Sequence, residues 1–222
     1  MTTTTTTLGG EKGGLPLLES GVIAVVRAPA AVGLRAVARA LAAGGVGAVE
    51  ITLTTPGAIA AIAELARDAT LAGCLVGAGT VLDETAARAV IDAGARFVVS
   101  PALDHAVLHA CRERDVPCMP GAFTPTEILE AWRAGASLVK LFPAASLGPD
   151  FIRDVLAPLP FLRLVPSGGV TLENAGDWIR AGAAAVSVGG ALLREALRGH
   201  ESAEALTARA RLLVTQVKAA RA

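Results

Sequence analysis

Hydrophobic positions along this chain follow two periods, one typical of helices and one typical of strands. Four times, an alanine-rich stretch with helical spacing runs through Ala-Gly into a short β-branched run: LAAGGVGAVEI, IDAGARFVVS, WRAGASLVKL and IRAGAAAVSV. Glycine at a helix C-terminus followed directly by a strand is typical of the helix-to-strand connections of α/β proteins. The pattern therefore predicts a chain of alternating helices and strands.

Eight apolar runs are short enough to be strands, and helical patterns separate them. The predicted strands lie near residues 22–27, 47–53, 74–78, 96–100, 116–119, 138–142, 163–166 and 185–189. The segment TPTE, from Thr124 to Glu127, is a capping box with proline at the first helical position. It predicts the start of the helix that follows the fifth strand.

These strands are apolar on both faces and every connection is helical, so the sheet should be parallel and covered by helices. Eight such units predict a (β/α)8 barrel over residues 17–222, with a doubly wound open sheet as the alternative. Residues 1–16 have low complexity and are predicted to form a disordered tail. In a barrel, functional side chains belong at the C-terminal ends of the strands.

Composition narrows the classes of function. The 222 residues are 53% hydrophobic and 18% charged, and twenty basic side chains balance twenty acidic ones, so no net charge favours nucleic acid or an anionic membrane surface. The longest weakly polar run, between Arg180 and Arg194, is too short to span a bilayer. Three cysteines without a CxxC pair argue against a disulfide framework or a thiolate zinc site, and they favour a cytoplasmic protein.

Three of the predicted strands carry a charged residue in their interior or at their C-terminal end. Because side chains alternate along a strand, Lys140 in SLVKLF shares a face with Leu138 and Phe142. In GAVEITLT, Glu50 shares a face with Thr52 and Thr54, opposite a fully apolar set. Arg27 ends the strand VIAVVR. Helices should cover the apolar face, so these three charged side chains are expected to converge inside the barrel.

The residue pattern is compatible with two interpretations of this convergence. The first is a buried ion-pair network, since buried charges are costly unless they are paired. The second is catalytic: a lysine in apolar surroundings near another cation loses its proton below its ordinary pKa and can attack a carbonyl to form a Schiff base. Glu50 would then carry protons. The other two lysines, Lys12 in the tail and Lys218 near the C-terminus, do not compete for this role.

Glycine pairs follow the last two predicted strands, in VPSGGV and VSVGGAL. Free backbone N–H groups and a helix dipole at such a turn suit a phosphate group, and barrels often bind phosphate after strands 7 and 8. VGAGTVLD lacks the third glycine of a dinucleotide fingerprint and is interpreted as a tight turn. His105 and His109 stand four apart without the carboxylate of a metal motif, so a solvated or packed helix face is expected, and no metal.

Eight segments in register carry a resemblance to a known family: VIAVVRA, GGVGAVEITLTTP, VGAGTVLD, ARFVVSPALD, MPGAFTPTEI, LVKLFPA, VPSGGV and AVSVGGAL. They resemble the 2-dehydro-3-deoxy-6-phosphogluconate (KDPG) aldolases and 4-hydroxy-2-oxoglutarate aldolases. The resemblance implies a (β/α)8 barrel that forms a homotrimer. It also implies a class I lyase of the Entner–Doudoroff pathway, which releases pyruvate and glyceraldehyde 3-phosphate without metal or cofactor.

The resemblance also assigns roles by position. It implies that Lys140 is the Schiff-base lysine and Glu50 the acid/base. The residues expected to contact the substrate are Arg27, Thr54, Thr80, Pro101, Phe142 and Ser167, and those expected to hold its phosphate are Gly168, Gly169, Gly189 and Gly190. Some family members have arginine where this chain has Thr54, so the contact with the substrate carboxylate is expected to shift towards Arg27 and Thr80.

Three alternative functions remain at this stage. One is an aldolase directed to the phosphogalactonate substrate, although EITLTTP is closer to the gluconate type. Another is a phosphate-binding barrel isomerase or epimerase, which would use the glycine loops without a Schiff base. The third is a non-catalytic sensor of phosphorylated sugars, which would not need a lysine inside a strand.

Overall fold

The strands form two parallel sheets. The computed structural model describes residues 18–221, so the tail predicted over residues 1–16 lies outside the described residues. The strands are β1 (Val22–Val26), β2 (Ala48–Thr52), β3 (Leu75–Gly79), β4 (Val98–Val99), β5 (Cys118–Met119), β6 (Gly121–Ala122), β7 (Val139–Leu141), β8 (Leu164–Pro166) and β9 (Val186–Val188). Six of them pair in the order β5-β4-β3-β2-β1-β9 and three in the order β6-β7-β8.

Hydrogen bonds join the two sheets at both seams. At one seam, the backbone N–H groups of Ser137 and Lys140 donate to the carbonyls of Cys118 and Pro120. At the other, Ser167 bridges Ser187 in parallel. The parallel α/β arrangement expected from the sequence is therefore confirmed.

Pro120 explains one difference from the predicted strands. The fifth strand, expected near residues 116–119, consists of the two short strands β5 and β6 with Pro120 between them. Proline has no N–H group and cannot donate to a neighbouring strand, so the ladder is interrupted at that residue. The other seven predicted strands each overlap an observed strand.

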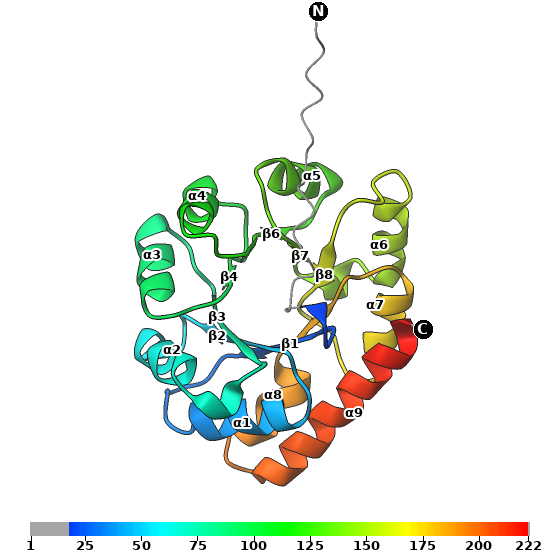
Figure 1. Cartoon of the computed structure of the whole chain (residues 1–222). Coiled ribbons are helices and arrows are strands. Elements are labelled where there is room, and N and C mark those ends of the chain that lie inside the picture. The colour runs from blue at the N-terminus through cyan, green and yellow to red at the C-terminus, as the bar shows by residue number, and fades with distance from the viewer. Residues whose placement is uncertain (1–17, 222) are drawn as a thin grey trace, which may run out of the picture.

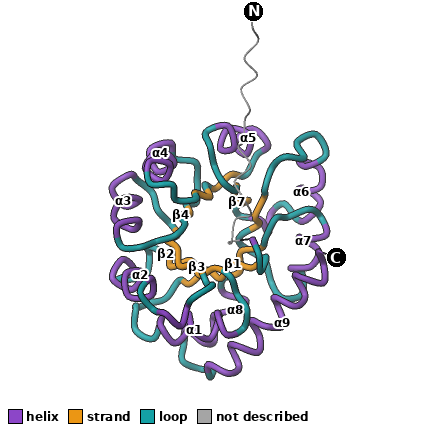
Figure 2. Tube along the Cα trace, viewed as in Figure 1, coloured by secondary structure: helices purple, strands orange, loops and turns teal. Residues whose placement is uncertain are grey.

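Helices surround the strands on the outside (Figures 1 and 2). They are α1 (Leu34–Ala43), α2 (Ala58–Ala66), α3 (Glu84–Asp92), α4 (His105–Glu113), α5 (Pro125–Arg133), α6 (Pro149–Leu156), α7 (Ala175–Arg180), α8 (Gly190–Leu197) and α9 (Ala203–Arg221), with two 3₁₀ turns at Ala69–Leu71 and Ala144–Ser146. The predicted capping box is present: the Thr124 hydroxyl accepts from the Glu127 N–H group, and the Glu127 carboxylate accepts from the Thr124 N–H group.

Two separate hydrophobic clusters confirm the predicted strand phase. Ile23, Ala48 and Leu138 belong to a small inner cluster between the strands. Val49 and Val139, one position further along their strands, belong to the large cluster between strands and helices. Side chains with the phase of Leu138 therefore face inward, and Lys140 is two residues further along the same face.

A buried carboxylate ties α1 to the segment after α2. Asp68, whose side chain is 2% exposed, accepts hydrogen bonds from Arg35 and Arg39 of α1 and from the hydroxyl of Thr70. Hydrogen bonds from Arg39, Arg35 and Thr70 lower the pKa of Asp68 well below its ordinary value. A carboxyl group with a lowered pKa stabilises the fold above the pKa it has in the unfolded chain, and this contribution is lost as the pH falls.

Asp68→Asn should therefore lower the melting temperature at pH 7, because two guanidinium groups lose their charged acceptor. The difference from the unchanged protein should shrink as the pH falls below about 4, where unfolded aspartates take up protons. Thermal melts from pH 7 to pH 3 measure both effects. Asp150→Asn is the matched control, because Asp150 pairs with Arg153 at an exposed site and should contribute little. A pH-independent loss would contradict this account of Asp68.

Candidate active site

Lys140 projects from the middle of β7 into the space between the strands. It is paired in register with Gly121 on β6 and Val165 on β8, and the residue is only 7% exposed. Its Nζ lies 5.0 Å from the centre of the Phe142 ring. A primary amine is thus held at a fixed inward position, with the inner hydrophobic cluster on one side of it and a cavity on the other.

Glu50 projects inward from β2 and is 1% exposed. Neither of its carboxylate oxygens has a hydrogen-bond partner among residues 18–221. Burial raises the pKa of the Glu50 carboxyl group above its ordinary value, and the positive charges of Lys140 and Arg27 only partly offset that shift. Lys140 and Arg27 are therefore both close enough to Glu50 to influence the ionisation of its carboxyl group.

The position of Glu50 depends on a glycine in the neighbouring strand. A Cβ built on Gly79 of β3 would overlap the carboxylate of Glu50. The φ of Gly79 is not positive, so the requirement is for space rather than for an unusual backbone. Gly79, the second glycine of VGAG, thus leaves room for the Glu50 carboxylate.

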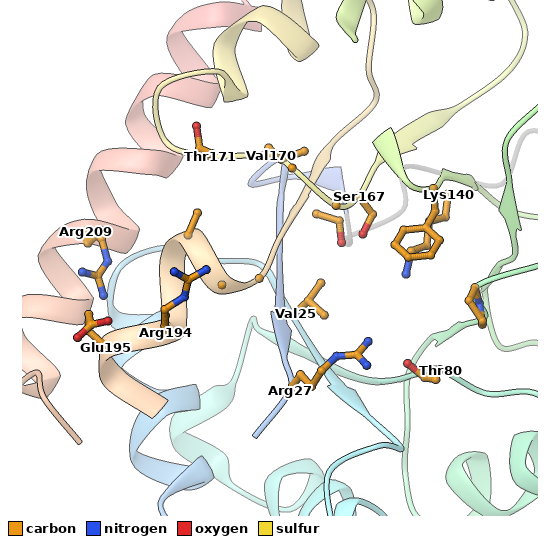
Figure 3. Close-up of a pocket in the computed structure, with 18 residues that line it drawn as sticks. Val25, Arg27, Thr80, Lys140, Ser167, Val170, Thr171, Arg194, Glu195 and Arg209 are labelled. Carbon is orange, nitrogen blue, oxygen red and sulfur yellow. The ribbon is translucent and has the colours of Figure 1, made fainter. Parts of the chain in front are cut away.

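A cavity of about 840 Å³ opens above Lys140 at the C-terminal ends of the strands (Figure 3). Ten of the twelve predicted site residues line it: Arg27, Thr80, Pro101, Lys140, Phe142, Ser167, Gly168, Gly169, Gly189 and Gly190. In Figure 3, Lys140, Arg27, Thr80 and Ser167 surround the same open space. One cavity therefore brings a primary amine, a guanidinium group, hydroxyl groups and both glycine pairs together.

Two predicted residues do not line this cavity. Glu50 lies in the inner face of β2, and its side chain is buried. Thr54 is exposed, because β2 ends at Thr52 and the chain then turns, so the strand phase does not extend to it. The Thr54 hydroxyl lies 3.0 Å from that of Thr52.

Backbone conformation shapes the cavity at two places. Thr80, directly after β3, has a φ of 58°, which is rare for a β-branched residue and costs on the order of 1–3 kcal/mol. Gly168 and Gly169, after β8, have φ values of 83° and 87°, and a Cβ on Gly169 would overlap Ala145. Only glycine fits there, and the turn brings backbone to the cavity without side chains.

The second glycine pair joins β9 directly to α8. Gly189 precedes the first turn of this helix, and Gly190 is its first residue. The N-terminal end of α8 therefore faces the cavity, with the positive end of its dipole and its first N–H groups. Both glycine loops thus offer an anion backbone donors rather than bulky side chains.

The sequence of the chain matches a known protein family. Residues 16–208 match the family model described as "Aldolase: KDPG and KHG aldolase". The chain belongs to this family. The family expected from the sequence and the carbon–carbon lyase activity that comes with it are confirmed.

Individual members of the aldolase family are similar over most of the chain. A probable 2-dehydro-3-deoxy-6-phosphogalactonate aldolase of Rhizobium meliloti is 38% identical over 81% of this chain and 85% of that protein. The structure of a 4-hydroxy-2-oxoglutarate/2-dehydro-3-deoxyphosphogluconate aldolase from TTHB1 is 35% identical, with a TM-score of 0.79, and covers 92% of this chain and 100% of that one. A Legionella pneumophila KDPG aldolase, with pyruvate captured as a covalent carbinolamine, is 30% identical, with a TM-score of 0.77, over 88% of this chain and 95% of that one.

Eight cavity residues of this aldolase were not predicted from the sequence, and the polar ones among them are Thr171, Ser187, Arg194, Glu195 and Arg209. A signal for Ser187 was present, because in AVSVGG it shares the strand phase of Ala185, which faces the inner cluster. Arg194 stands one helical turn after Gly190, so its helix spacing also pointed to the loop. Arg209 comes from α9, far along the chain, and no local pattern indicates its place.

The two histidines on α4 have the surroundings that the sequence predicted. His105 and His109 are exposed on α4 and lie near Glu130 and Glu113, in agreement with the predicted solvated face. Within residues 18–221, no group of three or more histidine, cysteine, aspartate or glutamate side chains could hold a metal ion. No helix in that same part of the aldolase is long and apolar enough to cross a membrane.

Proposed function

We propose that this chain is a class I aldolase that cleaves 2-dehydro-3-deoxy-6-phosphogluconate into pyruvate and glyceraldehyde 3-phosphate through a Schiff base on Lys140. The observation that supports this most strongly is the convergence of Lys140 and Glu50 below a cavity bounded by two glycine loops. An amine nucleophile, a proton carrier and a phosphate site are the three parts that such a reaction needs.

The first half of the reaction forms the covalent intermediate. The unprotonated amine of Lys140 adds to the C2 carbonyl of the substrate and gives a carbinolamine. Glu50 protonates the departing hydroxyl group, so water leaves and an iminium ion remains. The raised pKa of Glu50 suits this step, because burial favours the protonated carboxyl group, which is the form that can act as an acid.

The second half breaks the carbon–carbon bond. The carboxylate form of Glu50, through a water where the distance requires one, takes the proton of the C4 hydroxyl. The electrons of the C3–C4 bond move into the iminium, which becomes an enamine, and glyceraldehyde 3-phosphate leaves. Protonation of the enamine carbon and hydrolysis then release pyruvate and restore the amine. Phosphate held at the glycine loops orients the scissile bond by remote binding energy.

Arg27, Thr80, Pro101, Phe142 and Ser167 would position the substrate in this proposal. Arg27 and Thr80 lie on the cavity wall where they can reach the carboxylate and hydroxyl end. Thr54 does not line the cavity, so it is proposed to support the end of β2 through its contact with Thr52 rather than to touch the substrate. Ser167 and the four glycines of the two loops would hold the phosphate.

A galactonate-directed activity is the second candidate, because the relative from Rhizobium meliloti carries that name. Coupled assays of pyruvate release with the phosphogluconate, phosphogalactonate and 4-hydroxy-2-oxoglutarate substrates decide between the activities. We expect the highest kcat/KM with the phosphogluconate substrate. A higher value with the galactonate epimer would transfer the main activity to it. If none of the three substrates yielded pyruvate, an isomerase or a sensor would be favoured.

Gly79→Ala should lower kcat for pyruvate release by about a hundredfold, because the added methyl group displaces the Glu50 carboxylate. The control is Gly176→Ala on α7, where a new Cβ meets only the flexible end of Arg180. Steady-state kinetics with melting curves for both variants separate misplacement from unfolding. Full activity in a folded Gly79→Ala variant would contradict the role assigned to this glycine.

The same proposal extends to four further properties of the protein. The two sheets and their seams would form one closed (β/α)8 barrel, the protein would assemble as a homotrimer, and it would work in the cytoplasm without metal or organic cofactor. The hydrogen bonds at both seams support closure. Sedimentation equilibrium tests the trimer, and full activity after exhaustive chelation tests the independence from metal.

A further inference from the structure

Arg194 lies over the second glycine loop. It is one helical turn after Gly190 on α8, and its side chain folds back towards the start of the helix. A Cβ built on Gly190 would lie 3.5 Å from Nη2 of Arg194 and 3.9 Å from its Nε. In Figure 3 the guanidinium group lies beside the first turn of α8, and Arg194 is among the residues that line the cavity. A positive side chain therefore stands at the place where the backbone already favours an anion.

The charge of Arg194 is not used within the part of the chain that the structure describes. None of the ion pairs between residues 18 and 221 includes it. The other arginine at this end of the cavity, Arg209, pairs with Glu201, and its Nε donates to the carbonyl of Leu192. Arg194 is thus a cation at this end of the cavity that remains available to a ligand, whereas Glu195, which lines the same end, lies near Arg198 and His200.

A buried hydroxyl group in the same cavity also lacks a partner. Ser187 of β9 is 1% exposed, lines the cavity two residues before Gly189, and its Oγ has no hydrogen-bond partner in residues 18–221. Buried hydroxyl groups are normally hydrogen-bonded, so an unpaired one that lines a cavity indicates a bound ligand or water. This observation is independent of the helix end and of Arg194.

We propose that Arg194 binds the phosphate dianion of the substrate and determines the preference for phosphorylated over unphosphorylated 2-keto acids. The inference rests on the proposed function and adds to it the residue that reads the substrate's charge. A planar guanidinium group suits this role, because it can donate two parallel, charge-assisted hydrogen bonds to phosphate oxygens. The backbone N–H groups of the glycine loops would position the phosphate, and the guanidinium group of Arg194 would bind its negative charge.

The test compares two substrates in Arg194→Ala, Arg194→Lys and the unchanged protein. Charge-assisted hydrogen bonds predict that Arg194→Ala lowers kcat/KM for the phosphorylated substrate about ten- to a hundredfold, mainly through KM. The value for 4-hydroxy-2-oxoglutarate, which has no phosphate, should change less than about threefold. Arg194→Lys should recover part of the loss, because it restores the charge without the planar fork. Arg153→Ala, at an exposed pair on α6, is the matched control and should leave both values unchanged.

Binding of inorganic phosphate, measured by calorimetry, tests the same residue without catalysis. We expect Arg194→Ala to weaken it about tenfold or more and Arg153→Ala to leave it unchanged. Equal losses for both substrates, or no loss with the phosphorylated one and unchanged phosphate binding, would overturn the assignment to Arg194. Absence of pyruvate from every substrate in the unchanged protein would instead overturn the proposed function, and the phosphate titration would still decide the role of Arg194.

Discussion

Lys140→Ala should abolish pyruvate release, with kcat lower by about a thousandfold or more, because no other group in the cavity can form the iminium that accepts the electrons of the breaking bond. The fold should persist, since the inner hydrophobic cluster that lies along β7 does not include this side chain. A coupled assay of pyruvate measures the loss, and circular dichroism with a melting curve verifies the fold.

Two further variants make this result interpretable. Lys140→Met keeps most of the side-chain volume without the amine and should be as inactive as the alanine variant. Lys218→Ala changes the only other lysine in the described residues, on α9, and should leave kcat unchanged. Substantial activity in a folded Lys140→Met protein would mean that the amine is not the nucleophile.

Glu50→Gln should lower kcat by about a hundred- to ten-thousandfold, the usual contribution of a positioned acid or base. In the unchanged protein, the acidic limb of the pH–rate profile should lie above the ordinary range of a glutamate, because burial raises the pKa of Glu50. This limb should disappear in the variant. A profile of kcat from pH 4.5 to pH 9 tests both statements, and an unchanged acidic limb in Glu50→Gln would assign it to another group.

The same carboxylate should reduce the stability of the fold. A group whose pKa is raised by folding binds its proton more tightly in the folded state, so the fold loses stability as the pH rises above the unfolded pKa of about 4.3. Glutamine has no such titration. The melting temperature of Glu50→Gln, relative to the unchanged protein, should therefore rise between pH 4 and pH 8. A variant that loses activity while it gains stability at pH 8 separates a catalytic role from a structural one.

Strand periodicity predicted the inward-facing part of the site, because the face on which a strand residue lies depends only on the alternation of side chains along the strand. The face of Lys140 follows from Leu138 two residues earlier, and the observed inner cluster contains Leu138. The phase fails at Thr54, where β2 has already ended and the chain turns. It is interrupted at Pro120, where the missing N–H group divides the fifth strand.

Features that depend on contacts between distant segments could not be predicted in the same way. That Gly79 makes room for the Glu50 carboxylate depends on the register of β2 against β3, which the sequence does not give. Arg209 reaches the cavity because α9, at the end of the chain, packs against α1, α7 and α8 (Figure 1). These residues are identified only when the elements are placed in three dimensions.

The proposed mechanism requires a covalent intermediate on Lys140, and reductive trapping detects such an intermediate. Incubation of the unchanged protein with pyruvate and borohydride, followed by peptide mapping by mass spectrometry, should find one reduced pyruvate on the peptide that contains Lys140, with loss of activity in proportion to labelling. Lys140→Met should remain unlabelled. A protein that retains its activity and its unmodified Lys140 after this treatment, or that carries the adduct on Lys218, would contradict the mechanism.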